Sequence, residues 1–190
     1  MNATRLLILD RDGVINADSD NYIRSLDDWE PIPGSITAIG RLSRAGYTVA
    51  IATNQSGLGR GYFQLEHMQS IHDRLRRLVE QEGGRIAGIY YCPHLPDGAC
   101  NCRKPATGML QQLEGELQQS AKNAFFVGDS LKDLQAAQAY SCRPVLVKTG
   151  KGMKTLRTIL SDNPGVNNPL DIPVYRDLLA VCDAILAGAI

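Results

Sequence analysis

The chain has 190 residues, with 20 basic and 20 acidic side chains and no formal net charge at pH 7. Its length fits one compact domain with a single hydrophobic core, so we expect residues 1–190 to form a single domain. Balanced charge argues against nucleic acid or an anionic membrane as the partner. We therefore expect a small-molecule partner and no binding to nucleic acid or membrane.

The first residues carry no pattern typical of export. Only four consecutive apolar residues, at positions 6–9, precede a charged cluster, which is too short a run for a signal peptide or a membrane span. We expect a cytoplasmic protein, and we expect it to be a monomer.

Short strand-like runs alternate with longer segments of helical period along the chain, which is typical of an α/β domain with a mainly parallel sheet. We expect strands at 6–9, 48–52, 86–91, 124–127 and 145–147. We expect helices at 35–45, 64–82, 109–117 and 134–140.

The pattern after residue 150 is weaker. A short helix is expected at 153–160, a turn-rich stretch at 161–168 and a helix at 175–186. Pro173 would suit only an edge strand, because proline cannot donate to a sheet hydrogen bond. This tail supports no functional prediction from its residues alone.

Two pairs of carboxylates follow predicted strands. Asp10 and Asp12 come after the first strand, and Asp129 and Asp133 come after the strand at 124–127. Ligands of open parallel sheets bind at the carboxyl ends of the strands. A lone Asp-x-Asp is more often part of a solvated loop, but four acids at one sheet edge require a cation, and Mg²⁺ suits such oxygen ligands.

Polar and basic residues follow two further strands. Thr53 ends the second strand and begins a polar run of Asn54, Gln55 and Ser56, which could receive a phosphate or form only a turn or helix cap. Lys104 lies after the third strand and by itself would be read as a solvated surface lysine.

The order Asp-x-Asp-x-Val, Thr, Lys-Pro and Gly-Asp-x-x-x-Asp closely resembles the haloacid dehalogenase superfamily over residues 5–150. That resemblance implies a three-layer α/β sandwich and a phosphatase that forms an aspartyl-phosphate intermediate. It implies that Asp10 is the nucleophile, that Asp12 is the general acid, and that Thr53 and Lys104 hold the phosphoryl oxygens. Mg²⁺ would bind Asp10, Asp129 and the carbonyl of Asp12.

Two residues near the last motif are expected to act indirectly. We expect Asp133 to fix Lys104 or a metal-bound water instead of binding the metal itself, and we place Ser130 in the same supporting group.

The segment 92–102 predicts a structural zinc site. Cys92, His94, Cys100 and Cys102 provide three thiolates and one imidazole, a complete tetrahedral ligand set. A disulfide or free thiols are the alternatives, but nothing indicates a secretory protein. Cys142 and Cys182 are expected to be small buried apolar residues. His67 and His72, on the helix at 64–82, are expected to lie at the surface.

The superfamily often inserts a cap domain between its motifs, but these intervals have room for only about one helix and one strand each, so we expect no separate cap. The pocket should then be open, and loops should select the substrate. The expected substrate-binding residues are Asp18, Asn21, Tyr22, Asn54, Gln55, Ser56, Arg60 and Arg103.

A narrower resemblance rests on Asp-Arg-Asp-Gly-Val-Ile-Asn, Thr-Asn-Gln-Ser-Gly, Tyr-Tyr-Cys-Pro-His and Cys-x-Cys-Arg-Lys-Pro. Together they resemble the D-glycero-D-manno-heptose 1,7-bisphosphate 7-phosphatase family, part of lipopolysaccharide biosynthesis, with histidinol-phosphate phosphatase as a close relative. The resemblance implies hydrolysis of the C7 phosphate, with Arg103 recognising the substrate. Histidinol-phosphate hydrolysis and a non-catalytic zinc-stabilised scaffold are the alternatives.

Overall fold

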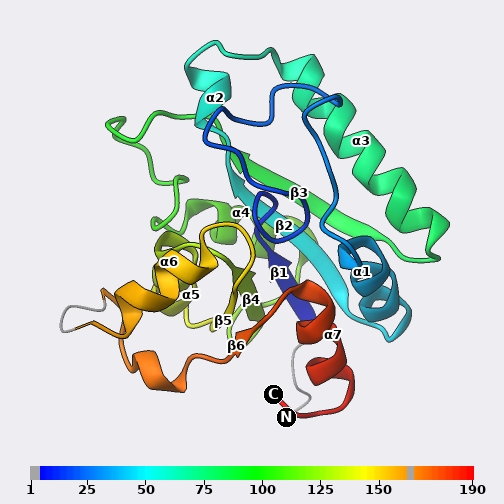
Figure 1. Cartoon of the computed structure of the whole chain (residues 1–190), viewed down its shortest axis with the longest axis vertical. Helices are drawn as coiled ribbons and strands as arrows, with labels where there is room; N and C mark the ends of the chain where they lie inside the picture. Colours follow the sequence, from blue (N-terminus) through cyan, green and yellow to red (C-terminus); the bar gives the residue numbers. More distant parts are fainter. Residues whose placement is uncertain (1–4, 162–164) are drawn as a thin grey trace.

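The computed structural model describes residues 5–161 and 165–190. Its centre is a six-stranded parallel sheet of order β3-β2-β1-β4-β5-β6 (Figure 1). The strands are β1 (Leu6–Leu9), β2 (Thr48–Asn54), β3 (Ile86–Cys92), β4 (Phe125–Gly128), β5 (Arg143–Val147) and β6 (Val174–Tyr175). From β1, the strands β2 and β3 follow one another on one side of the sheet, and β4, β5 and β6 follow one another on the other side. This reversal between β1 and β4 creates the crevice where ligands of such sheets bind.

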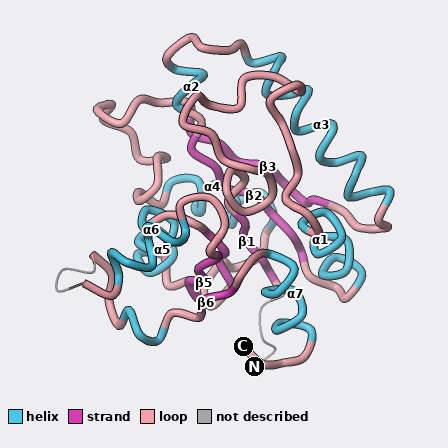
Figure 2. Tube along the Cα trace, in the orientation of Figure 1, coloured by secondary structure: helices cyan, strands magenta, loops and turns pink. Residues whose placement is uncertain are grey.

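Helices cover both faces of the sheet and complete a three-layer sandwich (Figures 1 and 2). One layer contains α1 (Ser35–Arg44), α3 (Leu65–Gln81) and α7 (Leu178–Leu186). The other contains α4 (Gly108–Leu117), α5 (Leu131–Ala139) and α6 (Gly152–Ile159). Two short helices, α2 (Ser56–Gly59) and η1 (Pro169–Asp171), lie in connections.

The apolar run in β1 shows why the sequence forms this architecture. Leu7 and Leu9 pack into the core beneath α1, α3 and α7, whereas Leu6 and Ile8 pack into the core beneath α4 and α5. All four side chains are fully buried. Burial of one such side chain contributes about 1.5–3 kcal/mol, so a continuous apolar run is favoured in a strand covered on both faces.

The predicted α/β class and the order of the main elements are confirmed. The helix expected at 134–140 begins earlier, at Leu131, because Ser130 and Asp133 form a capping box. The helix expected from 175 begins at Leu178, because Val174 and Tyr175 pair with β5 as an edge strand after Pro173.

Two further expectations concern the connections and the tail. Between β1 and β2 the chain forms α1, and between β2 and β3 it forms α2 and α3, so the part described contains no separate cap. Residues 162–164 of the expected turn-rich stretch lie outside the described residues. No helix in the described ranges is long and apolar enough to cross a membrane.

Candidate active site

Asp10 stands at the reversal point of the sheet. It follows β1 directly, and its backbone N–H donates to the carbonyl of Val127 in β4 at 2.9 Å. Its side chain accepts a hydrogen bond from the Arg11 N–H (2.7 Å) and is nearly buried. The nucleophile predicted from the sequence is therefore held between the two central strands.

Lys104 contacts two carboxylates. Its Nζ lies 2.9 Å from Asp10 Oδ1 and 2.6 Å from Asp133 Oδ1, and it donates to the carbonyl of Ala52 at 2.7 Å. Burial alone would lower the pKa of Lys104, but Asp10 and Asp133 outweigh that effect and raise it. The lysine is thus a buried cation, not the surface residue its sequence context alone would suggest.

The backbone of Lys104 is fixed by Asn54. The Lys104 N–H donates to Asn54 Oδ1 (3.0 Å), and Asn54 Nδ2 donates back to the Lys104 carbonyl (3.1 Å). This reciprocal pair ties the end of β2 to the segment that carries Lys104. Asn54, expected to bind substrate, lines the cleft but commits its amide to this backbone.

Asp129 lies in a narrow cradle after β4. Its Oδ2 accepts the Lys151 N–H at 2.7 Å, and the side chain is almost fully buried. Gly13 and Gly150 approach it from two loops, and a Cβ at either position would overlap Asp129 Oδ2. Both glycines have positive φ values (84° and 55°), so side chains are disfavoured there on conformational grounds as well.

Oxygens of Asp10, Asp129 and Asp133 lie within 4.8 Å of one another. Burial and the Asp133 charge raise the pKa of Asp10 to about 7, and burial and the Asp10 charge raise that of Asp129 to about 8. Buried carboxylates in such proximity favour binding of a cation, and an all-oxygen donor set fits Mg²⁺.

Asp133 is occupied by other partners. Its Oδ1 pairs with Lys104, while its Oδ2 accepts the Ser130 N–H (3.0 Å) and the Ser130 hydroxyl (2.6 Å). Of the two roles expected for Asp133, these contacts favour fixing Lys104, with Ser130 in support.

The Asp12 carboxylate is held from several sides. Arg11 donates to both oxygens (2.9 and 3.0 Å), Asn16 Nδ2 donates to Oδ1 (2.9 Å), and Gln55 Nε2 donates to Oδ2 (2.8 Å). Burial would raise the pKa of Asp12, but the Arg11 charge and these hydrogen bonds outweigh it and lower the pKa. Gln55 Nε2 also donates to Thr53 Oγ1 at 2.9 Å, which links Asp12 to the predicted phosphate-binding hydroxyl.

These groups face one cleft of about 580 Å³. Of the predicted site residues, the cleft is lined by Asp10, Asp12, Asp18, Tyr22, Thr53, Asn54, Gln55, Ser56, Arg60, Arg103, Lys104, Asp129, Ser130 and Asp133. Asn21 is not among the lining residues. It lies exposed in a turn closed by its N–H to Ser19 Oγ (3.1 Å), so its role in substrate binding stays a prediction.

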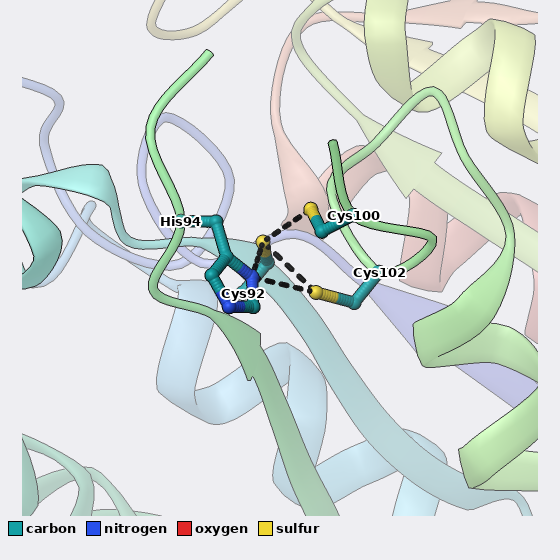
Figure 3. A group of neighbouring side chains, drawn as sticks. All are labelled: Cys92, His94, Cys100 and Cys102. Atoms are coloured by element: carbon teal, nitrogen blue, oxygen red, sulfur yellow. Dashed lines mark hydrogen bonds between the residues drawn. The ribbon is translucent and has the colours of Figure 1, made fainter. Parts of the chain in front are cut away.

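The cysteine-rich loop brings its four predicted ligands together (Figure 3). Cys92 Sγ lies 3.7 Å from Cys100 Sγ and 3.1 Å from Cys102 Sγ, and His94 Nδ1 lies 3.5 Å from Cys92 Sγ and 3.2 Å from Cys102 Sγ. Zinc bonds of about 2.0–2.3 Å place tetrahedral ligand atoms roughly 3.5–3.8 Å apart. The donor set therefore fits zinc, and all five cysteines are free thiols.

The cysteine-rich loop also positions Arg103. The guanidinium donates from Nη1 to the carbonyl of His94 at 3.2 Å, and Arg103 lines the cleft. The loop that gathers the thiols therefore supports a cationic group at the pocket.

Known proteins resemble this chain over nearly its whole length. A family model described as HAD-hydrolase-like matches residues 101–165. The D-glycero-beta-D-manno-heptose-1,7-bisphosphate 7-phosphatases of Pseudomonas putida and Pseudomonas aeruginosa are 57% and 54% identical to it. The alignments cover 96% and 95% of this chain, and 99% and 97% of those proteins. The chain belongs to the heptose 1,7-bisphosphate 7-phosphatase family.

Solved structures of the family agree with this fold. The D,D-heptose 1,7-bisphosphate phosphatase of Bordetella bronchiseptica, complexed with magnesium and phosphate, superposes with a TM-score of 0.88 at 45% identity. That comparison covers 96% of this chain and 98% of the other. The Burkholderia thailandensis enzyme gives a TM-score of 0.70 at 38% identity, with the same coverage of both chains.

In this family member, sequence reasoning missed part of the cleft wall. Lys151, Lys154, Thr155 and Thr158 line it, in the tail for which the sequence supported no functional prediction. Lys151 Nζ pairs with Asp18 Oδ2 at 2.8 Å. A lysine flanked by glycines shortly after a strand was the signal that could have identified this wall.

Two buried residues were also missed. Arg11 is 1% exposed, and His72 is 8% exposed, so the expected surface position of His72 was wrong. His72 lies on the side of α3 that carries the buried Met68, Ile71 and Leu75. His67 lies exposed as expected, and Cys142 and Cys182 are buried as expected.

Proposed function

We propose that residues 1–190 act as one magnesium-dependent phosphatase domain that removes the C7 phosphate of D-glycero-β-D-manno-heptose 1,7-bisphosphate. The observation that carries this proposal is the convergence of Asp10, Asp129 and Asp133 beside Lys104 at the sheet reversal. Family membership supports the substrate, and the site retains every group that phosphoryl transfer requires, which argues against a non-catalytic scaffold.

Asp10, Asp129 and the main-chain carbonyl of Asp12 would hold the Mg²⁺ ion. Bound there, Mg²⁺ would neutralise negative charge on the nucleophile and the phosphoryl oxygens. Lys104 Nζ and the Thr53 hydroxyl would bind the remaining phosphoryl oxygens, because both reach the cleft beside Asp10.

In the first step, a carboxylate oxygen of Asp10 attacks the C7 phosphorus. The bond between phosphorus and the sugar oxygen breaks, its electron pair stays on that oxygen, and the Asp12 carboxyl supplies the proton. The products are the aspartyl phosphate on Asp10 and the free C7 hydroxyl. The charge of the bound phosphate favours the protonated Asp12 that this step needs.

In the second step, a water oxygen attacks the phosphorus of the aspartyl phosphate and gives its proton to Asp12. The bond from phosphorus to Asp10 breaks, and its electron pair restores the Asp10 carboxylate. Arg11 lowers the pKa of Asp12 and so favours the carboxylate form that accepts this proton. Inorganic phosphate leaves with the enzyme regenerated.

The remote phosphate distinguishes the heptose bisphosphate from histidinol phosphate. Arg60, Arg103, Lys151 and Lys154 are four further basic residues that line the same cleft. We assign recognition of the second phosphate to this group, with Arg103 as its main member. Arg103→Ala should then impair hydrolysis of the bisphosphate more than hydrolysis of histidinol phosphate, and equal losses would contradict the assignment.

We further propose that Zn²⁺ binds Cys92, His94, Cys100 and Cys102 as a structural ion. With four protein ligands the coordination is closed, which leaves no position for a reacting water. The ion would stabilise the segment 92–102 and the position of Arg103.

The test of function is phosphate release by the purified protein with Mg²⁺, measured side by side for heptose 1,7-bisphosphate and histidinol phosphate. We expect a higher kcat/KM for the heptose bisphosphate. Preference for histidinol phosphate would contradict the proposed substrate but keep the chemistry, and no release from either would contradict the proposed activity.

The covalent step is tested by Asp10→Asn. Because the amide is a poor nucleophile, we expect turnover to fall by about 10³-fold or more, with the fold retained. Asp183→Asn is the matched control, since Asp183 pairs with Arg41 on the helical layer and is largely exposed. Substantial residual activity of Asp10→Asn would contradict an aspartyl-phosphate intermediate.

A further inference from the structure

Arg11, which holds the Asp12 carboxylate, has a buried contact with His72, a residue that the proposed steps do not use. His72 projects from α3, and its Nε2 lies 3.3 Å from Arg11 Nη1. A guanidinium has only donors, so Nε2 must be the acceptor, and the ring proton then resides on Nδ1. Burial and the Arg11 and Arg76 charges lower the pKa of His72 to about 3, which agrees with a neutral ring.

His72 contacts the terminal nitrogen of Arg11 that has no other partner among the described contacts. Arg11 Nε donates to Asp12 Oδ1 (2.9 Å), and Nη2 donates to Asp12 Oδ2 (3.0 Å) and to Gln55 Oε1 (3.1 Å). The guanidinium is planar and rigid, so a contact at Nη1 fixes the orientation of the whole group. That plane in turn sets the plane of the Asp12 carboxylate, because the two groups are joined by two parallel hydrogen bonds.

We propose that His72 is a positioning residue for the phosphatase reaction, which orients Asp12 for proton transfer by holding Arg11. This inference rests on the proposed function, in which Asp12 protonates the leaving oxygen. His72 is not among the residues that line the cleft, so its effect passes through Arg11. A purely structural role for His72 predicts lower stability, with no selective effect on the proton-transfer step.

Two variants at position 72 separate these roles. His72→Leu places an apolar side chain in the buried site and removes the acceptor, whereas His72→Gln supplies an amide oxygen that can accept from Arg11. His67 gives the matched control, since it lies exposed on the same helix, where its ring accepts from the Gln64 N–H at 3.4 Å. His67→Leu and His67→Gln therefore repeat both substitutions away from Arg11.

The experiment measures how the effect of each substitution on the reaction rate depends on the leaving group of the substrate. A sugar alkoxide needs the proton from Asp12, whereas p-nitrophenolate is a good leaving group and departs without one. The experiment compares kcat and KM for the heptose bisphosphate with the first-turnover release of p-nitrophenol from p-nitrophenyl phosphate. Thermal unfolding with and without Mg²⁺ is measured for each variant, to show that fold and metal site persist.

For His72→Leu we expect kcat on the bisphosphate to fall roughly tenfold or more, with KM nearly unchanged. The first turnover of p-nitrophenyl phosphate should change by less than about threefold, since Asp12 is not needed there. His72→Gln should restore most of the lost kcat, and both His67 variants should match the wild type.

Equal losses on the two substrates, no loss, or no restoration by His72→Gln would each overturn the proposal. Failure of the proposed function is separately visible, because it would appear in the wild type as inactivity toward the bisphosphate. In that case the His72 variants are compared on p-nitrophenyl phosphate and on a sugar phosphate that the wild type does hydrolyse. The outcomes named above then support or overturn the role of His72 in the same way.

Discussion

Gly13 and Gly150 approach the carboxylate of Asp129 closely, and this makes both glycines sensitive positions. In Gly150→Ala the new Cβ would overlap Asp129 Oδ2 and displace the predicted metal ligand. We expect the Mg²⁺ concentration for half-maximal activity to rise by about tenfold or more, since one displaced ligand weakens the site.

The control for that variant is Gly188→Ala. Gly188 has a similar positive φ (68°), but a Cβ added there would meet nothing within 4 Å, so the variant carries the conformational penalty without the overlap. Its Mg²⁺ requirement should equal that of the wild type. An unchanged requirement in Gly150→Ala would contradict the expected displacement of Asp129 as a metal ligand.

The raised pKa of Asp129, about 8, makes the stability of the metal-free protein depend on pH. From the ordinary value of 3.8 up to about 8, the folded protein binds protons that the unfolded chain has lost, so stability falls as pH rises through this range. Mg²⁺ takes the place of the proton, and its effect on Tm should therefore be larger at pH 8 than at pH 6.

Thermal unfolding with and without Mg²⁺ at both pH values checks this expectation. Asp129→Asn should remove most of the Mg²⁺ effect and raise the metal-free Tm at pH 8 by about 2–4 °C, as expected for roughly 1 kcal/mol in a chain of this size. A Mg²⁺ effect that is the same at pH 6 and pH 8 would contradict the proposed link.

Individual site residues could be predicted from the sequence where they lie at the end of a strand, because a strand end can be recognised from a few neighbouring residues. Asp10 and Asp129 directly follow β1 and β4, and Thr53 lies at the end of β2, so all three could be found in that way. Arg11 and His72 could not, because their contact joins positions 61 residues apart and depends on how α3 packs. Asn21 lies in a turn and not at a strand end, so the rule of strand ends says nothing about its position.

Among the elements, the start of α5 combines a structural role with a catalytic one. Ser130 caps the helix and also donates to Asp133, which pairs with Lys104. Ser130→Ala should lower the free energy of unfolding by about 1 kcal/mol, as for a lost N-cap, and should reduce kcat severalfold.

Asp177→Ala is the matched variant, because Asp177 caps α7 by accepting the Ala180 N–H at 2.9 Å. The free energy of unfolding of Asp177→Ala should fall by a similar amount, about 1 kcal/mol, with activity unchanged. If both variants lost activity to the same degree, the effect would come from stability alone.

The loop 92–102 gives a prediction for metal removal. Cys102→Ser should lower the zinc content and Tm, and it should raise KM for the bisphosphate more than it lowers kcat. The reason is that Arg103 depends on this loop, whereas Lys104 is held separately by Asn54. Cys182→Ser, on the buried face of α7, is the control and should retain full zinc.

Zinc content measured by elemental analysis, together with kinetics in excess Mg²⁺, tests this prediction. Full zinc content in Cys102→Ser would contradict the proposed ligand set. An unchanged KM in a zinc-depleted protein would contradict the link to Arg103.

Element positions were predictable where a continuous apolar run or helical period is strong, as in β1 and α3. Boundaries set by capping contacts could not be predicted in this way. The helix α5, for example, starts at Leu131, three residues before its expected start. The two-residue strand β6 is defined by pairing with β5, so its own residues gave too little pattern to predict it.

For the whole molecule, the alternation of strands and helices predicted a parallel sheet, but not the position of β4 beside β1. That adjacency requires the chain to cross back over the sheet, and it brings Asp10 to the Asp129 side. The carboxylate pairs were read as neighbours only through the general behaviour of strand ends. The expected monomer and cytoplasmic location stay predictions.

The reciprocal hydrogen bonds between Asn54 and the Lys104 backbone have an evolutionary consequence. They anchor Lys104, which belongs to the proposed catalytic residues, to β2 independently of the cysteine-rich loop. Insertions or deletions between His94 and Cys100 would redirect Arg103 while leaving Lys104 in place. Descendants of such a protein could therefore acquire new substrates by changes in one surface loop, without rebuilding the catalytic apparatus.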